Sequence, residues 1–357
     1  MSWEENVRKV VPYVAGEQPQ GRVIKLNTNE FPYAPSPMVA SKMYDLAEGE
    51  IDGATSMLRK YPNMDAENLV NAIAHVYNVP FEKIFVGVGS DDVLAMSFLT
   101  FFNSKKPILF PDITYSFYDV WAELFKIPYE TQALDDNFFI SKDDYIGKSN
   151  GGIIIPNPNA PTGVYESLEM FEEIIKANPD SVVIIDEAYV DFGGVSALPL
   201  IDKYDNLLVV QTFSKSRALA GLRIGVAFGN EKLISYLKDV KFSFNSYTMN
   251  YPAIELATAS VLDVDYWNET VKKVIDTREW TKGELKKLGF SFNDSKANFI
   301  FATHVSKPAE EIFKALKEKD IYVRFFKKPR IDNYLRISIG TDEDMKALIE
   351  ALEEIVK

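Results

Sequence analysis

The chain has 357 residues and contains no cysteine, which excludes several kinds of chemistry at once. Disulfides, thiolate nucleophiles, iron–sulfur clusters and cysteine-based zinc sites all require thiols. Only two histidines are present, so a metal site with three histidine ligands is excluded as well. His75 lies off the apolar stripe of a helix predicted over 65–78, and His304 follows a predicted strand, so we interpret both as structural residues. Any proton chemistry must therefore use Lys, Tyr, Asp or a cofactor.

Positive charge and long apolar runs are also scarce. The 39 Lys+Arg against 52 Asp+Glu give a formal net charge of −13, so we expect no nucleic-acid partner, which would require a basic face. The longest apolar stretch without a charge, residues 93–103, falls well short of the roughly 20 residues that span a bilayer. The chain does not open with a signal-peptide pattern. We therefore expect a cytoplasmic protein with no metal and no membrane partner.

Short apolar runs alternate with helical patterns between residues 84 and 229, which is typical of an α/β fold with a doubly wound, mostly parallel sheet. The later part of the chain changes to short strands and helices of a small α+β domain. We predict an N-terminal arm over 1–28, a large domain over 29–248 and a small domain over 249–357. The strands predicted for the large domain cover 84–89, 107–110, 152–155, 182–186, 207–212 and 224–228.

Two glycine patterns resemble nucleotide-binding motifs, but neither is complete. Gly147-Lys148-Ser149 lacks the earlier glycine of a P-loop, because that position is Lys142. Gly87-Val88-Gly89 lacks the third glycine of a dinucleotide fingerprint, because that position is Asp92. The remaining feature is a strand followed by the turn 89–91 and a helix start, where free N–H groups and the helix dipole can bind a phosphate.

Two further groups of polar residues follow predicted strands. Asp186 closes the apolar run 182–185, at the edge where α/β proteins bind ligands. Lys215 follows the strand 207–212 and has Arg217 and Arg223 nearby, and cationic neighbours and burial both favour the free amine that reacts with a carbonyl. A phosphate seat, an acid and an amine together match the needs of a phosphorylated pyridine aldehyde. Taken singly, each could be an N-cap, an ion pair or a surface lysine.

The sequence resembles the fold-type-I pyridoxal-phosphate-dependent aminotransferases, and within them the histidinol-phosphate aminotransferase family. The resemblance extends over the whole chain and implies a seven-stranded sheet. The segment 212–225, TFSKSRALAGLRIG, is the most specific part of it. The other matching segments are VPYVAGE (11–17), KLNTNEFPYAPSP (25–37), RKYPN (59–63), VGSDD (88–92), NPNAPTG (157–163), IDEAYVDF (185–192) and YLRISIG (334–340).

The resemblance also implies roles for individual residues. Lys215 would bind pyridoxal 5'-phosphate covalently and move the substrate proton, Asp186 would pair with the pyridine nitrogen, and Tyr189 would hydrogen-bond the phenolic oxygen. The implied cofactor-binding residues are Ser90, Asp91, Tyr115, Asn157, Asp186, Tyr189, Ser214, Lys215 and Arg223, with Tyr61 supplied by the other subunit of a homodimer. The implied substrate-binding residues are Tyr13, Asn29, Arg324 and Arg336.

One position departs from the family pattern. Relatives usually carry asparagine directly before Pro-Thr-Gly, where this chain has Ala160. Either Asn157 or Asn159 takes over the hydrogen bond to the cofactor, or that bond is missing. The resemblance further predicts that the Ala160–Pro161 peptide bond is cis.

The activity implied by the resemblance is transamination between histidinol phosphate and 2-oxoglutarate in histidine biosynthesis. The basic stretch Lys327, Lys328 and Arg330 favours a phosphorylated substrate, because it concentrates positive potential in an acidic chain. A threonine-phosphate decarboxylase or an aromatic aminotransferase would share the cofactor residues and stays an alternative. A non-catalytic pyridoxal-phosphate-binding regulator is an alternative of another class.

Overall fold

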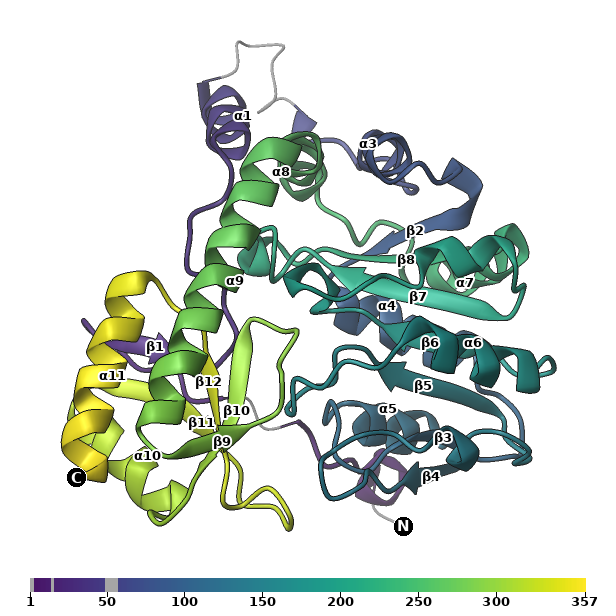
Figure 1. Cartoon of the computed structure of the whole chain (residues 1–357). Coiled ribbons are helices and arrows are strands. Elements are labelled where there is room, and N and C mark those ends of the chain that lie inside the picture. Colours follow the sequence, from purple (N-terminus) through teal and green to yellow (C-terminus); the bar gives the residue numbers. More distant parts are fainter. Residues whose placement is uncertain (1–2, 14–15, 49–56) are drawn as a thin grey trace.

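The computed structural model describes residues 3–13, 16–48 and 57–357. These residues form a seven-stranded and a five-stranded sheet, each packed with helices, and the long helix α9 (Val264–Lys287) runs from the helices beside the larger sheet to the smaller one (Figure 1). The short 3-10 turns between these elements are omitted below.

The larger sheet has the strand order β2-β8-β7-β6-β5-β3-β4. Neighbouring strands are parallel except around β8, which runs antiparallel to both β2 and β7. The mostly parallel α/β sheet predicted from the sequence is thereby confirmed. The strands are β2 (Ile84–Gly87), β3 (Ile108–Pro111), β4 (Tyr129–Gln132), β5 (Gly152–Pro156), β6 (Val183–Asp186), β7 (Leu207–Thr212) and β8 (Gly225–Gly229).

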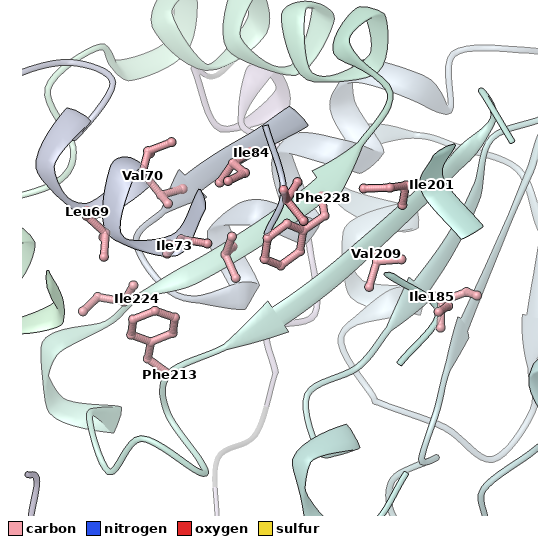
Figure 2. Close-up of a cluster of buried hydrophobic side chains, with 14 of the residues drawn as sticks. Leu69, Val70, Ile73, Ile84, Ile185, Ile201, Val209, Phe213, Ile224 and Phe228 are labelled. Carbon is pink, nitrogen blue, oxygen red and sulfur yellow. The ribbon is translucent and has the colours of Figure 1, made fainter. Parts of the chain in front are cut away.

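Both faces of this sheet are buried, which explains why its central strands lack polar alternation. Ile185 and Val209 point into one hydrophobic cluster, shown in Figure 2, whereas Ile184 and Leu208 point into another cluster on the opposite face. The helices packed into the first cluster are α3 (Glu67–Tyr77), α6 (Leu168–Ala177) and α8 (Tyr251–Leu262), joined by α1 (Pro37–Glu48). The helices of the second cluster are α4 (Ser90–Phe101), α5 (Tyr118–Phe125) and α7 (Glu231–Asn245).

The three central strands β5, β6 and β7 are parallel and in register, so their carboxyl ends meet at one edge of the sheet. Pro156 lies opposite Asp186, and Asp186 lies opposite Val210. The polar residues that follow these strands, including Asn157 and Lys215, therefore emerge at this edge. A ligand site at that edge is what the topology of α/β folds favours.

The smaller sheet has the order β1-β11-β12-β10-β9. Its first strand pairs in parallel with β11, although β1 lies inside the segment predicted as an N-terminal arm. The predicted domain boundaries after residues 28 and 248 stay predictions. The elements of this part are β1 (Ile24–Leu26), β9 (Phe290–Phe292), β10 (Phe299–His304), β11 (Ile321–Phe325) and β12 (Leu335–Ser338), with α10 (Ala309–Glu318) and α11 (Asp342–Val356).

His75 faces solvent and His304 lies at a turn, as predicted. His75 is exposed on α3. His304 ends β10, where its ring bonds the carbonyl of Leu288 at 2.9 Å and accepts the backbone N–H of Lys307 at 3.0 Å. The ring thus satisfies backbone groups of a turn.

An ion pair with a buried lysine of α7 holds the first turn of α4 in place. Lys241 of α7 is 2% exposed and pairs with Asp92, whose carboxylate also accepts the backbone N–H of Val88 at 2.9 Å. Because removing one partner leaves the other charge without compensation, we expect Lys241→Met to lower the free energy of unfolding by about 3 kcal/mol. Urea denaturation of the ligand-free protein measures this loss.

The control is the same substitution at Lys272, whose ion pair with Asp276 is exposed on α9. Exposed pairs contribute little, so Lys272→Met should change stability by less than about 1 kcal/mol. Equal losses in the two variants would show that the Lys241–Asp92 pair has no special role.

Candidate active site

Lys215 lies three residues beyond the end of β7 and points toward the segment that follows β1. Its Nζ atom donates to the carbonyl oxygen of Thr28 at 3.4 Å and lies 5.6 Å from the ring centre of Tyr189. Three segments that are distant in sequence therefore converge on this amine: the loop after β7, the loop after β6 and the segment after β1. All three segments contain residues that the sequence resemblance assigned to the site, with Asn29 in the third, but the contact of Lys215 with the Thr28 carbonyl was not predicted.

Asp186, the last residue of β6, carries a carboxylate that is almost fully buried. One oxygen accepts the hydroxyl of Tyr118 at 2.8 Å, and the other accepts the N–H of Ala188 at 3.2 Å. Burial raises the pKa of Asp186 to about 6, although both hydrogen bonds act in the opposite direction. Within the described part of the chain no cation forms an ion pair with this carboxylate, so its charge has no positive partner there.

The adjacent carboxylate of Glu187 is buried in a different network. It accepts hydrogen bonds from Ser196, from the N–H of Ala197 and from Gln211. Burial raises the pKa of Glu187 to about 7. Because these hydrogen bonds occupy Glu187, Asp186 rather than Glu187 is the candidate acid of the site.

A second feature of the site is a seat for an anion at the start of α4. The helix is preceded by Gly89, which has no side chain to cap the first N–H groups of Ser90 and Asp91. Arg223 reaches the same place, where its guanidinium lies 3.0 Å from the Asp91 carboxylate and 3.3 Å from the Ser214 hydroxyl. The predicted phosphate-binding residues are therefore gathered in one place.

Two glycines allow this close arrangement. A Cβ atom on Gly89, whose φ is +84°, would lie 2.4 Å from the guanidinium of Arg223. A Cβ atom on Gly225 would lie 2.4 Å from the backbone nitrogen of Ser90. Both contacts are far shorter than side chains permit, so the loop, the helix start and Arg223 approach each other only because these positions carry no side chain.

Tyr115 closes the seat on the side of α5. Its hydroxyl donates to the Asp91 carboxylate at 2.8 Å, and burial, with Asp91 close by, raises the pKa of Tyr115. Its ring forms an edge contact with Tyr118 at 5.8 Å. Tyr115 is therefore held by the Asp91 side chain, beside the first N–H groups of α4.

Two arginines of the smaller sheet form the opposite wall. Arg324 and Arg336 are paired residues of β11 and β12, and no carboxylate forms an ion pair with either among residues 3–13, 16–48 and 57–357. Burial lowers the pKa of Arg336, and the charge of Arg324 acts in the same direction. Arg324 and Tyr13 line a cavity of about 700 Å³, and Tyr13 stacks on Phe117 at 4.2 Å.

Two of the three basic residues in the stretch 327–330 form ion pairs, so they are less available to bind a substrate than the sequence suggested. Lys327 pairs with Glu310 at 3.4 Å, and Arg330 pairs with Asp112 at 2.9 Å. Arg330 also donates to the carbonyls of Leu134 and Asp135, so it connects the two sheets. Lys328 lines the cavity, and it alone of the three is without an ion pair in the described structure.

The asparagines near Ala160 are engaged elsewhere. Asn157 exchanges two hydrogen bonds with the backbone of Glu166, at 2.8 and 3.0 Å. Asn159 donates to the carbonyl of Ile113 and accepts from Thr114. The structure thus gives no support to a cofactor contact by either side chain, and the role of Asn157 stays a prediction. The Ala160–Pro161 bond is cis as predicted, and so is Asn157–Pro158.

Asn29 and Tyr61 differ in how they relate to the rest of the site. Asn29 is 1% exposed and donates from its side chain to the Tyr189 hydroxyl at 2.9 Å, so it reaches the site through Tyr189. Tyr61 is 82% exposed and stacks on Tyr247 at 4.7 Å beside a separate groove, and its contacts within one chain do not involve Lys215.

Three contributors to the site escaped sequence reasoning: the Tyr118 hydroxyl, the Thr28 carbonyl and the Ser338 hydroxyl, which bonds Asn29. The dense aromatic run around Tyr115 and Tyr118 is the one sequence signal that could have drawn attention to Tyr118. The role of a backbone carbonyl such as that of Thr28 cannot be predicted from residue types, because every residue has one.

Comparison with known proteins agrees with this geometry. The profile of the family "Aminotransferase class I and II" matches residues 21–352. The chain belongs to this family.

Within the family, the chain is similar to proteins named histidinol-phosphate aminotransferase. The protein of that name from Lactococcus lactis subsp. cremoris is 50% identical over 358 residues, which is 100% of this chain and 98% of that protein. The one from Clostridium beijerinckii is also 50% identical, with 99% of this chain and 97% of that protein covered. Among solved structures, the Sinorhizobium meliloti histidinol-phosphate aminotransferase in complex with pyridoxal-5'-phosphate has the same fold, with a TM-score of 0.84, 21% identity and 94% and 91% of the two chains covered.

The burial of Asp186 predicts a pH-dependent effect of its neutralisation. Its pKa of about 6 exceeds the ordinary value of 3.8, so the folded state holds this proton more tightly than the unfolded state. The stability gained from that proton is present at acidic pH and is lost as pH rises from about 4 to about 6. In the ligand-free protein Asp186→Asn should therefore be more stabilising, relative to wild type, at pH 8 than at pH 4.5.

Urea denaturation at the two pH values measures this difference. The same substitution at exposed Asp180 is the control and should give equal differences at both pH values. A stability difference for Asp186→Asn that does not change with pH would mean that the carboxylate is not held in a desolvated state.

Proposed function

We propose that this chain is a pyridoxal-phosphate-dependent aminotransferase that transfers the amino group of histidinol phosphate to 2-oxoglutarate, giving imidazole-acetol phosphate and glutamate in histidine biosynthesis. Full-length identity of 50% to proteins named for this activity carries the proposal. The geometry supports it independently, because an amine, a buried acid and an anion seat converge opposite two arginines without carboxylate partners.

The residues present fit pyridoxal phosphate. The buried carboxylate of Asp186 lacks a cation, and a protonated pyridine nitrogen would supply one. The start of α4, Ser214 and Arg223 offer N–H, hydroxyl and guanidinium donors to a phosphate. When bound, the cofactor supplies an aldehyde that exchanges amines and a ring that withdraws electrons from the substrate carbon.

The side chains of the site have separate roles in this proposal. Lys215 would hold the cofactor through its amine, and once a substrate amine has taken its place the free Nζ atom would be the base that moves the proton of the substrate carbon. Asp186 would hold a protonated ring nitrogen, because a desolvated carboxylate interacts strongly with a neighbouring cation. Tyr189 would donate its hydroxyl hydrogen to the phenolic oxygen, and Tyr115 would lie against the ring.

Arg324 and Arg336 would bind the two substrates in turn. Histidinol phosphate presents a phosphate where glutamate and 2-oxoglutarate present a carboxylate, and a planar guanidinium suits both anions. Two guanidinium groups without carboxylate partners repel each other in a half-buried wall, and an anion removes that repulsion. Tyr13 lines the same cavity and would cover the bound substrate.

The alternatives have weaker support. A threonine-phosphate decarboxylase or an aromatic aminotransferase would use the same cofactor residues, but the 50% identical relatives carry neither name. A non-catalytic regulator would have no need of two neighbouring arginines without carboxylate partners.

The proposal includes a homodimer in which Tyr61 of one subunit reaches the site of the other. Several aromatic and aliphatic side chains near Tyr61 are exposed, which is typical of a surface that is covered by a partner. These residues are Met43, Tyr44, Leu58, Tyr61, Phe244 and Tyr247. No helix within the described residues is long and apolar enough to cross a membrane, and a cytoplasmic location belongs to the same proposal.

The proposed reaction is tested by assaying the cofactor-loaded protein with three substrates side by side. Histidinol phosphate with 2-oxoglutarate should give glutamate, whereas threonine phosphate should release no carbon dioxide and phenylalanine should be a poor donor. Borohydride reduction followed by peptide mass spectrometry should place the cofactor on Lys215, and Lys215→Ala should be inactive. Carbon dioxide release from threonine phosphate without transfer from histidinol phosphate would replace the proposed activity by the decarboxylase.

The shared site is tested by mixing two inactive variants. Tyr61→Ala lacks the contribution to the neighbouring site, and Lys215→Ala lacks the amine in its own site. After the two are unfolded and refolded together, half of the dimers are mixed, and one of their two sites is intact, so about a quarter of wild-type activity should return. Refolding each variant alone is the control. A mixture as inactive as its components would contradict the exchange of Tyr61 between subunits.

A further inference from the structure

The hydroxyl of Tyr189 is held by a buried side chain from the beginning of the chain. Asn29 Nδ2 donates to the Tyr189 oxygen at 2.9 Å. A phenol has one hydrogen, so an oxygen that accepts here keeps its own hydrogen for another partner. No acceptor for that hydrogen is found among the described residues, and the Lys215 amine lies 5.6 Å from the ring centre of Tyr189.

The direction of this hydrogen bond is set by the backbone. The N–H of Asn29, which can only donate, bonds Ser338 Oγ at 2.9 Å, and the Ser338 hydroxyl donates in turn to Asn29 Oδ1 at 2.9 Å. The amide NH₂ must then face Tyr189. Turning the amide over would leave the hydrogen of Ser338, a 2% exposed residue, without an acceptor.

Asn29 itself is immobilised. Its φ of +56° lies in the left-handed region, which asparagine tolerates better than most residues. Its carbonyl accepts the side chain of Asn298 at 3.0 Å, and Asn298 is fully buried. The amide that bonds Tyr189 is therefore fixed at both the backbone and the side chain.

The side-chain amide that relatives usually carry directly before Pro-Thr-Gly is absent, because that residue is Ala160. Ala160 contributes only a methyl group to the small cluster that packs against the Tyr189 ring, and Asn157 and Asn159 bond elsewhere. Of these side chains, the Tyr189 hydroxyl is thus the one with a hydrogen left to donate to a bound cofactor.

We propose that Asn29 is a positioning residue, which fixes the Tyr189 hydroxyl so that its hydrogen points into the site and bonds the phenolic oxygen of pyridoxal phosphate. This inference rests on the proposed cofactor. Asn29 thereby acts through Tyr189, in place of the direct substrate contact predicted from the sequence.

The spectrum of the bound cofactor reports this effect without any substrate. A hydrogen donated to the phenolic oxygen withdraws electron density, so the nitrogen that joins Lys215 to the cofactor releases its proton at lower pH. Asn29→Gly removes the amide, and glycine tolerates the left-handed backbone. The midpoint of the absorbance change of the cofactor-loaded protein should therefore rise by about half a pH unit.

Asn27→Gly is the matched control. Asn27 lies two residues away, is 2% exposed and donates its amide to the carbonyl of Glu17 instead of to Tyr189. Its replacement removes a buried amide from the same segment and should leave the midpoint unchanged. A shift equal to that of Asn29→Gly would show that loosening the segment is the cause and would overturn the proposal.

The decisive comparison uses Tyr189→Phe. This change alone should raise the midpoint, and Asn29→Gly added to it should have no further effect, because the hydroxyl that Asn29 orients is gone. An undiminished effect of Asn29→Gly in the phenylalanine background would overturn the proposal, as would the absence of any shift with Tyr189 present.

Asn29→Asp provides a second variant of nearly the same shape. A carboxylate accepts the Tyr189 hydroxyl and turns its hydrogen away, so the midpoint should rise more than with glycine, and most of the rise should vanish in the Tyr189→Phe background. A rise of the same size in both backgrounds would indicate charge alone and contradict the proposal.

Failure of the proposed function can be recognised separately. A wild-type protein that does not bind pyridoxal phosphate would overturn both proposals. A wild-type protein that binds the cofactor but does not use histidinol phosphate would overturn only the substrate, because the pH titration still decides the role of Asn29.

Discussion

The desolvation of the Asp186 carboxylate is the constraint on which the site depends. Apolar strands on both sides and the Tyr118 hydroxyl take the place of water around this carboxylate, and its raised pKa reflects the cost. The hydrophobic clusters on the two faces of the sheet offset that cost. A cation beside Asp186 would recover part of this desolvation cost, so the ligand-free protein would gain affinity for a positively charged group at this place.

The same principle holds at the opposite wall. Arg324 and Arg336 lie next to each other without carboxylates, whereas Arg330 and Lys327 nearby are paired. Arg223, at the start of α4, is paired with Asp91, so it is Arg324 and Arg336 that stand without a carboxylate in the described structure. Because Asp186 lacks a cation and the arginines lack anions, the pattern selects a ligand that is positive at one end and negative at the other.

The fold could be predicted from the sequence where burial leaves a pattern. Strands β5 to β7 are apolar throughout because both of their faces are covered, and they were predicted within one residue or so. The edge strand β4, with the sequence YETQ, was missed because three of its four residues are exposed. The three residues of β1 are too few to show any periodicity, and their pairing with β11 depends on a partner far along the chain.

The candidate site divides in a similar way. Asp186 and Lys215 could be predicted together because parallel strands end at a common edge. Their hydrogen-bond partners could not, since Tyr118 is 68 positions from Asp186 and Asn29 is 160 positions from Tyr189. Asn157 lies directly after β5, as expected, but its amide bonds the backbone of Glu166, so its role toward a cofactor stays a prediction. Residue type and strand end predict which groups meet, but the direction of a side chain depends on the packing of distant segments.

The pairing of β1 with β11 has a consequence for the synthesis of the protein. Asn29 is held by Ser338, which lies 309 positions later, so a growing chain contains Lys215 and Tyr189 well before it contains the clamp for Asn29. Ser338 follows Lys215 by 338 − 215 = 123 residues, so at translation rates of about 5–20 residues per second the delay is on the order of ten seconds. During that interval the large sheet can fold around the lysine while Tyr189 is still free to rotate its hydroxyl. Addition of β1 to the edge of the small sheet, beside β11, thus waits for the last part of the chain, and a chain that ends before β12 would lack the Ser338 hydroxyl that bonds Asn29.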